Sequence, residues 1–256
     1  MRYLIVLFSL LISACSTYWW GGNDGYFVQL IGKHRLQFIG DTTMENALKL
    51  EHVLNTAGKE VKTLYVTSGG GPVTGGMKIG ELVFERNLKV VVKTLCASSC
   101  ANYIATASHD TEVEKGAFLG WHGGSTQPLY ADYGSEPSLL RRFWFWLTGR
   151  DLDKETDDYI RQWHTEEVEF FNKIGVKQAI TIIGMMPAYI DKRDAKLFAY
   201  NKELLPKLGA NIRFQDENPA EFHEDGFKIV QVFELSQREL KEALELHERT
   251  LRLNDW

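Results

Sequence analysis

Short apolar runs and helix-forming segments alternate between Leu64 and His122, and this alternation restricts the fold more than any other feature of the chain. Three apolar runs read as buried strands, and two segments between them carry apolar residues at helical spacing. The strands are 64–67, 88–92 and 117–121, and the helices are 73–84 and 101–107. Strands that alternate with helices pair in parallel through right-handed crossovers. The stretch therefore predicts an α/β fold with a mainly parallel sheet.

Each of these strands is followed by residues of the kinds that take part in catalysis or ligand binding. Three glycines at 69–71 lead from the first strand to a helix and expose unpaired backbone N–H groups, which suit a phosphate or a developing oxyanion. Ser98 lies among small residues before the second helix, where its hydroxyl is expected beside free N–H groups. His122 follows the third strand. Ligands bind beyond the carboxyl ends of parallel strands, so we expect these residues at one edge of the sheet.

The segment from Leu64 to Met77 resembles the strand, glycine loop and helix start of the Clp protease proteolytic subunit, in the Clp/crotonase superfamily. In that family a serine in an Ala-Ser setting starts a later helix, and a histidine follows after a strand. The resemblance implies that Ser98 is a nucleophile and that His122 is its general base. The turn departs from the family pattern at Gly69, where proline is usual.

The resemblance also implies the rest of the site and the overall architecture. The backbone N–H groups of Gly71 and Ser99 match the donors of the family's oxyanion hole, and Asp194 is the nearest match to its catalytic aspartate. Asp191 is the next candidate, and a dyad without a carboxylate is the third option. The implied fold is a Clp/crotonase-like spiral of β-β-α units. The predicted parts are a core over 26–214 with a helical insertion at about 123–170, and a C-terminal strand and helix over 215–256.

The sequence leaves alternatives for the site residues and for the function. Ser99 competes with Ser98 as nucleophile, and His109 competes with His122 as base, although His109 lies in a polar loop. A crotonase-like acyl-CoA enzyme would use the same two-donor oxyanion hole without Ser98 and His122, but an exported protein would lack coenzyme A. A non-catalytic lipoprotein that uses the fold for binding or assembly is the main alternative to a serine hydrolase.

The N-terminus reads as an export signal. Met1-Arg2 provides a positive start, and the apolar run 3–12 is shorter than the roughly 20 residues that span a bilayer. The small residues before Cys15 resemble a bacterial lipobox, which implies a signal peptide over 1–14, lipidation of Cys15 and a tether over 15–25. Ser16 resembles a sorting signal for the outer membrane, on its periplasmic face. A plain signal peptide or a short membrane anchor is the alternative.

Lipidation of Cys15 would leave Cys96 and Cys100 in an oxidising compartment. A spacing of four across a helix start can place their Cα atoms about 6 Å apart, within disulfide range. Such a bridge would encircle Ser98 and hold the turn that presents it. Two buried free thiols are the alternative. Zinc is not expected, because the cluster offers two cysteines and no histidine close by.

The net charge and the family resemblance limit the binding partners that are expected for this chain. The formal net charge is −5, and no basic run appears, so the sequence argues against nucleic-acid binding. No cofactor is expected. A peptide or protein substrate is preferred through the resemblance alone. Since that family assembles rings or trimers, a homo-oligomer is also implied, although the insertion after His122 can prevent the same ring.

Five further elements are predicted from local patterns. A hairpin joins strands 26–31 and 35–39, and an acidic helix covers 153–172. Capping boxes at Thr42 with Glu45 and at Ser236 with Glu239 are expected to start helices that end near 56 and 253, and Gly58 is expected to terminate the first. The apolar segment 175–189 predicts a buried helix that breaks near Pro187. Consecutive aromatic residues at 143–147 cannot share one helix face, so membrane contact, partner contact and packing all remain open.

Overall fold

The computed structural model describes residues 27–127, 152–190, 195–216, 222–224 and 227–253. The predicted signal peptide over 1–14, the tether over 15–25 with Cys15, and the aromatic segment 143–147 lie outside these residues. Their roles stay predictions, as do the predicted domain boundaries.

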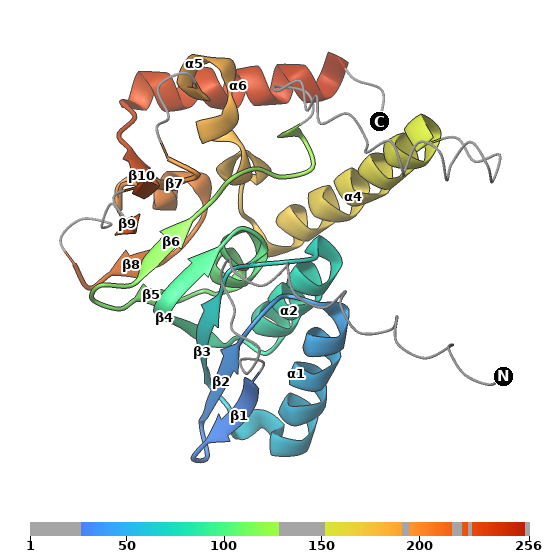
Figure 1. The fold of residues 1–256 in the computed structure, drawn as a ribbon, viewed down its shortest axis with the longest axis vertical. Helices are drawn as coiled ribbons and strands as arrows, with labels where there is room; N and C mark the ends of the chain where they lie inside the picture. Colours follow the sequence, from blue (N-terminus) through green and yellow to red (C-terminus); the bar gives the residue numbers. More distant parts are fainter. Residues whose placement is uncertain (1–26, 128–151, 191–194, 217–221, 225–226, 254–256) are drawn as a thin grey trace, which may run out of the picture.

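A seven-stranded sheet forms the centre of the described chain (Figure 1). Its strands are β1 (Phe27–Ile31), β2 (Arg35–Ile39), β3 (Thr63–Ser68), β4 (Lys89–Ala97), β5 (Thr111–Val113), β6 (Phe118–Gly120) and β8 (Ile212–Phe214). The order is β1-β2-β3-β4-β5-β8, and β6 pairs with β4 beside β5. Every pairing in this sheet is parallel except the β1–β2 hairpin. The predicted α/β class and the predicted hairpin are therefore confirmed.

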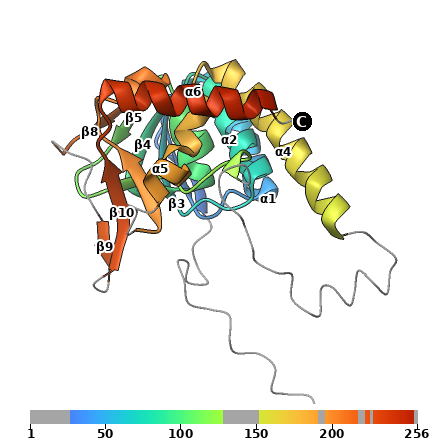
Figure 2. The ribbon, with the colours of Figure 1, turned by 90° about the horizontal axis from the view of Figure 1, so that it is seen from above.

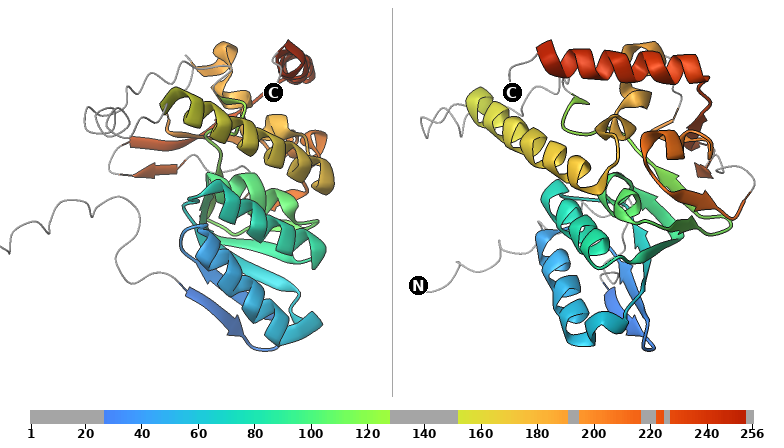
Figure 3. Two further views of the ribbon diagram at one scale, coloured as in Figure 1. Left: turned by 90° about the vertical axis from the view of Figure 1, so that its right-hand side faces the viewer. Right: turned by 180° about the vertical axis from the view of Figure 1, so that it is seen from behind.

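The crossovers between these strands are helical. They are α1 (Met44–Ala57) with the short η1 (Gly58–Glu60), α2 (Val73–Glu85) and the π-helix η2 (Cys100–Ala105). Helices α1 and α2 lie side by side along the strands, and α4 (Leu152–Ile174) extends beyond them (Figures 1 and 3). Helix α1 ends at Gly58, whose φ of 72° suits glycine, as the sequence predicts.

The start of α1 corrects one prediction. Thr43, not Thr42, is the N-cap, and its hydroxyl accepts a hydrogen bond of 3.1 Å from the backbone N–H of Asn46. The neighbouring Thr42 is fully buried, and its backbone N–H donates to the carbonyl of Gly70 at 2.8 Å. The Thr42 hydroxyl donates to the Pro72 carbonyl at 3.2 Å, so both its backbone and its side chain bond the glycine loop, and the cap lies one residue along the chain.

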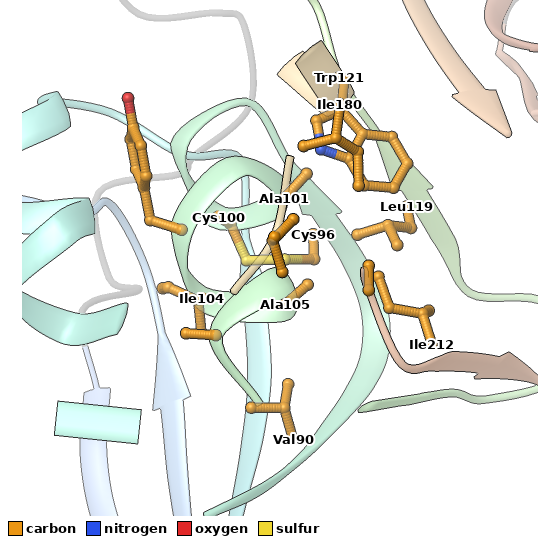
Figure 4. Close-up of a cluster of buried hydrophobic side chains, with 14 of the residues drawn as sticks. Val90, Cys96, Cys100, Ala101, Ile104, Ala105, Leu119, Trp121, Ile180 and Ile212 are labelled. Carbon is orange, nitrogen blue, oxygen red and sulfur yellow. A yellow bond between two sulfur atoms is a disulfide. The ribbon is translucent and has the colours of Figure 1, made fainter. Parts of the chain in front are cut away.

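One edge of strand β4 pairs with two strands in succession, and the core gathers around β4. Its first half pairs with β5 from Val90 to Val92, and its second half pairs with β6 from Leu95 to Ala97. Both faces of a shared central strand become buried, which explains its β-branched run. Figure 4 shows the buried side chains that gather where β4, β6 and η2 meet.

A second, three-stranded sheet lies beside the first and carries the C-terminal helix. It consists of β7 (Leu197–Tyr200), β9 (Phe222–Glu224) and β10 (Phe227–Phe233), with β10 between the others. Helix α6 (Gln237–Leu253) follows and lies over α4 and η6 (Leu205–Leu208) (Figure 2). Ser236 and Glu239 form the predicted capping box, since the Ser236 N–H donates to the Glu239 carboxylate and the Glu239 N–H donates to the Ser236 hydroxyl.

The apolar segment 175–189 does not form the predicted buried helix. It contains two short 3₁₀ turns, η4 (Gln178–Thr181) and η5 (Ile183–Met185), and Pro187 begins the short helix α5 (Pro187–Ile190) instead of breaking one. Proline suits a first helical position because its missing N–H has no intrahelical partner there. The burial that the sequence indicates is present, since Ile180, Ile182 and Ile183 are fully enclosed.

No helix within the described ranges combines the length and the apolar character that a membrane crossing requires.

Two histidines, one on α6 and one on α4, are buried in the fold. His247 of α6 is 5% exposed and His164 of α4 is 6% exposed. Burial lowers the pKa of His247 to about 4, and repulsion from His164 contributes further. Burial also lowers the pKa of His164. Both rings are therefore held neutral in the folded chain at neutral pH.

Acidification is expected to destabilise the fold through His247. Between the unfolded pKa near 6.5 and the folded pKa of about 4, only the unfolded chain takes up the proton, so the free energy of unfolding falls as the pH falls. The contribution lost between about pH 7 and pH 4.5 is about 2 to 3 kcal/mol. Urea unfolding of the wild type and of His247→Gln at both pH values measures it. An equal pH dependence in both proteins contradicts the prediction.

Candidate active site

The register of three parallel strands brings the glycine loop, Ser98 and His122 together. Ser68 at the end of β3 pairs with Cys96 of β4, and Ala97 at the end of β4 pairs with Gly120 of β6. Because parallel strands run in the same direction, the residues that follow these pairs emerge at the same edge. The loop after β3, the serine after β4 and the histidine after β6 therefore become neighbours.

Ser98 occupies a backbone conformation that side chains rarely adopt. Its φ is 57°, in the left-handed region, where a non-glycine residue costs about 1 to 3 kcal/mol. Two hydrogen bonds hold it there: the Ser98 N–H donates to the Gly120 carbonyl at 2.9 Å, and the Asn102 N–H donates to the Ser98 carbonyl at 2.8 Å. A strained strand-to-helix turn of this kind exposes the serine hydroxyl above the surrounding backbone.

The Ser98 hydroxyl and the His122 imidazole form a hydrogen bond. Ser98 Oγ lies 2.7 Å from His122 Nε2, with Ser98 half-buried and His122 exposed. The neighbouring Trp121 is fully buried, and it exchanges two backbone hydrogen bonds with Phe198, at 2.7 and 2.8 Å. The imidazole is therefore attached to an anchored strand end, while both reacting groups can be reached from solvent.

The glycine loop lies directly against this serine. Gly70 has a φ of +99°, and a Cβ built there would lie 2.6 Å from Ser98 Cβ and 2.7 Å from the Ala97 carbonyl oxygen. Gly71 has a φ of +129°, and among the described residues no acceptor pairs with its N–H. A free N–H beside the nucleophile is the arrangement that an oxyanion needs.

Ser99 holds the loop through its side chain. It is 2% exposed, and its hydroxyl donates to the Gly71 carbonyl at 2.7 Å. A buried hydroxyl that is already donating to a carbonyl is a poor nucleophile. The geometry therefore favours Ser98 as nucleophile, and the oxyanion-donor roles of Gly71 and Ser99 stay predictions.

A disulfide joins Cys96 and Cys100 across the Ser98 turn, which confirms the predicted bridge. The Cα atoms are 5.2 Å apart, and both residues are fully buried. Figure 4 shows the bridge surrounded by apolar side chains that include Ile104 and Trp121. Because so short a loop restricts the unfolded chain little, its main effect is to hold the turn around Ser98 in place.

The catalytic carboxylate remains open. Asp194 and Asp191 both lie outside the described residues, so the third member of the site stays a prediction. The rival base His109 is exposed at the surface, where its ring lies 5.2 Å from that of Phe84. The geometry therefore favours His122 as the base.

A second set of serine, histidine and glutamate lies behind this site, and the sequence reading missed it. Ser125 Oγ lies 3.1 Å from His164 Nδ1 and donates to Glu167 Oε2 at 2.5 Å. Ser125 and Glu167 are both fully buried, and the hydroxyl bonds the carboxylate instead of being activated through an intervening imidazole. This set is therefore a buried polar network and not a second catalytic triad.

One sequence signal could have revealed this network. Glu167 lies four residues after Trp163 and four before Phe171, on the apolar stripe of an otherwise acidic helix. A carboxylate on such a stripe must find hydrogen-bond donors inside the protein.

The described residues contain no group of three or more histidine, cysteine, aspartate or glutamate side chains placed to hold a metal ion.

Comparison with known proteins finds only distant structural similarity. No family model matches the chain, and no curated protein matches it. Among solved structures, the chain is similar to a point mutant of ClpP1 from Listeria monocytogenes. The two are 17% identical, the match covers 49% of this chain and 78% of that chain, and the TM-score is 0.29. A point mutant of the 1510-N membrane-bound stomatin-specific protease gives 14% identity, coverage of 79% and 96%, and a TM-score of 0.34.

A third structure, methylmalonyl CoA decarboxylase complexed with 2S-carboxypropyl CoA, gives 10% identity, coverage of 41% and 51%, and a TM-score of 0.32. Likeness at these TM-scores carries no argument about activity, which therefore depends on the geometry of the site itself.

Two neighbouring glycines of the loop should respond very differently to alanine. In Gly70→Ala the new methyl group would overlap Ser98 and Ala97, and the φ of +99° would be strained, so we expect a loss of about 2 to 5 kcal/mol in the free energy of unfolding. Gly69→Ala is the matched control, because its Cβ would meet nothing within 4 Å. Denaturant unfolding measures both variants. Equal stability of the two would show that the loop does not pack against Ser98.

Proposed function

We propose that this protein is a serine hydrolase that acts by acyl transfer through Ser98 and His122. The observation that supports it most strongly is the 2.7 Å hydrogen bond between Ser98 Oγ and His122 Nε2, at a solvent-accessible turn beside a glycine loop. A neutral imidazole with its proton on Nδ1 accepts the serine proton at Nε2 and leaves the oxygen free to attack.

The proposed reaction proceeds in two halves. Ser98 Oγ attacks a carbonyl carbon while His122 takes the hydroxyl proton, and the negative oxygen that forms is stabilised by the N–H groups of Gly71 and Ser99. His122 then gives the proton to the departing amine or alcohol, which leaves an acyl group on Ser98. A water molecule, deprotonated by His122, releases the acid and restores the serine.

The proposed substrate is a peptide or protein, a preference that comes from the sequence resemblance. An aspartate, Asp194 or Asp191, is proposed to orient His122 from the far side of the ring. The competing possibility is a non-catalytic lipoprotein that uses the fold for binding or assembly, and a reactivity test separates the two.

Labelling with a fluorophosphonate probe tests the mechanism. We expect the wild type to be labelled at Ser98, Ser98→Ala to be unlabelled, and His122→Ala to be labelled at least about 100-fold more slowly because the serine loses its base. Ser236→Ala serves as the matched control, since its hydroxyl belongs to the capping box of α6 and makes no described contact with the glycine loop, and its labelling should equal that of the wild type. Equal labelling of wild type and Ser98→Ala, or labelling of neither, favours the non-catalytic alternative.

We also propose that the protein is exported and anchored by lipid on Cys15 in a bacterial cell envelope, on the periplasmic face of the outer membrane. The lipobox-like residues before Cys15 support this, and so does the Cys96–Cys100 disulfide, because such bridges persist in oxidising compartments. A homo-oligomer is proposed from the resemblance alone.

Anchoring predicts that Cys15→Ala leaves the membrane fraction while Cys96 and Cys100 still form their bridge. We expect the wild-type protein to incorporate radiolabelled fatty acid in a bacterial host and the variant to incorporate none. Several acyl chains bind a bilayer firmly, whereas a single chain does so only marginally. Membrane association of Cys15→Ala equal to that of the wild type would contradict a lipid anchor.

A further inference from the structure

A single buried carboxylate connects the elements that carry Ser98 and His122. Glu167 of α4 is fully buried and accepts hydrogen bonds from three side chains and one backbone group. The Tyr103 hydroxyl donates to Oε1 at 2.6 Å, and the Gln178 amide donates to Oε2 at 2.8 Å. Ser125 donates twice to Oε2, through its N–H at 2.9 Å and its hydroxyl at 2.5 Å. All four contacts are donors, which suits an acceptor-only carboxylate.

The two oxygens of this carboxylate bond two different segments, one that carries Ser98 and one that carries His122. Tyr103 lies in η2, the helix that follows Ser98 directly in the chain. Ser125 lies three residues after His122, in the segment that leaves β6. Glu167 therefore joins the serine helix to the histidine segment through the side chain of a third element, α4.

A second contact joins the same two segments directly. The side-chain amide of Asn102, in η2, donates to the carbonyl of Gly123 at 2.9 Å, and Asn102 is 3% exposed. Together with Glu167 it leaves the histidine segment little freedom to move away from the serine helix.

The residues after His122 are packed as tightly as glycine allows. A Cβ at Gly124 would lie 2.3 Å from Thr181 Oγ1 and 3.1 Å from Glu167 Oε1. A Cβ at Gly123 would lie 1.8 Å from the side-chain oxygen of Gln127. The backbone of the histidine segment therefore lies directly on the network around Glu167.

The charge of Glu167 acts on its neighbours as well. The pKa of Tyr103 is raised well above its usual value by burial first, and then by the Glu167 charge and the hydrogen bond to it. Tyr103 therefore keeps its proton and remains a donor, and its oxygen accepts from the Trp163 indole N–H at 3.1 Å. Each polar group around the carboxylate has a defined direction of donation, which gives the network a single arrangement.

We infer that Glu167 is a positioning residue that holds the His122 segment at hydrogen-bonding distance from Ser98. This inference rests on the proposed hydrolase function, since it names the group that supports the dyad from behind. Glu167 touches neither reacting side chain in the contacts described here, so it acts through the Ser125 backbone and through Tyr103.

Replacing the carboxylate by an amide tests this role. In Glu167→Gln the side-chain NH₂ would face at least one of the four donors, so the Ser125 or Tyr103 contact must open. We expect fluorophosphonate labelling of Ser98 to slow about 10- to 100-fold, because a displacement of about 1 Å at a catalytic group costs up to that much. Glu166→Gln is the matched control on the same helix, since Glu166 bonds only Gln162 at the surface among described contacts, and its labelling rate should equal that of the wild type.

A double-mutant comparison distinguishes positioning from general damage. If Glu167 acts through His122, Glu167→Gln should slow labelling in the wild type and have no further effect in the His122→Ala background. An equal slowing in both backgrounds, or no slowing in either, overturns the inference. Should Glu167→Gln not fold, Ser125→Ala and Tyr103→Phe each remove one donor, and each should give a smaller loss that also depends on His122.

Nitrogen NMR of the His122 ring keeps the inference separate from the proposed function. His122→Ala assigns the imidazole signals among the seven histidines. We expect Glu167→Gln to shift the His122 Nε2 signal toward that of an imidazole without a serine partner. If the wild type is not labelled at Ser98, the hydrolase proposal fails, and a shifted His122 signal still supports positioning. An unchanged signal overturns it.

Discussion

Strand β4 pairs with β3, β5 and β6, and these three pairings set where the segments of the site lie. Parallel registers place Cys96 beside Ser68 and Ala97 beside Gly120, so three chain segments end at the same level of one sheet. A shift of one residue in either pairing would turn Ser98 or His122 to the other face. Such a shift is costly, because it would bring Lys89 or Lys93 into a position that a fully buried valine, Val90 or Val92, now fills.

The strand pairings set where Ser98 and His122 lie, and a second set of interactions sets how their side chains are oriented. The Ser98 turn is strained and needs support, which comes from the Cys96–Cys100 bridge below it and from backbone bonds on both sides. The His122 segment is supported through Asn102 and Glu167. Both reacting groups are thus accessible to solvent while the groups that hold them are buried, a division that favours preorganised chemistry.

Local patterns predicted most of the elements because they depend on neighbouring residues alone. The β1–β2 hairpin, the glycine end of α1 and the Ser236 capping box are all set by short-range contacts. The errors arose where a distant contact outweighed the local one. Thr42 matches a capping pattern but bonds the glycine loop. The apolar segment 175–189 folds into short turns whose backbone bonds distant residues, since the Lys177 N–H donates to the Leu208 carbonyl and the Ile180 carbonyl accepts from the Tyr200 hydroxyl.

Periodicity, chain order and local geometry were sufficient to predict the α/β class, the strand-end locations of Ser98 and His122 and the spacing of the disulfide. Long-range packing established the rest: Ser98 and His122 share a hydrogen bond, Ser99 bonds the glycine loop, and Glu167 lies beneath both segments. These contacts join residues 24, 28 and 42 positions apart, and no local pattern records which distant donor a buried acceptor will meet.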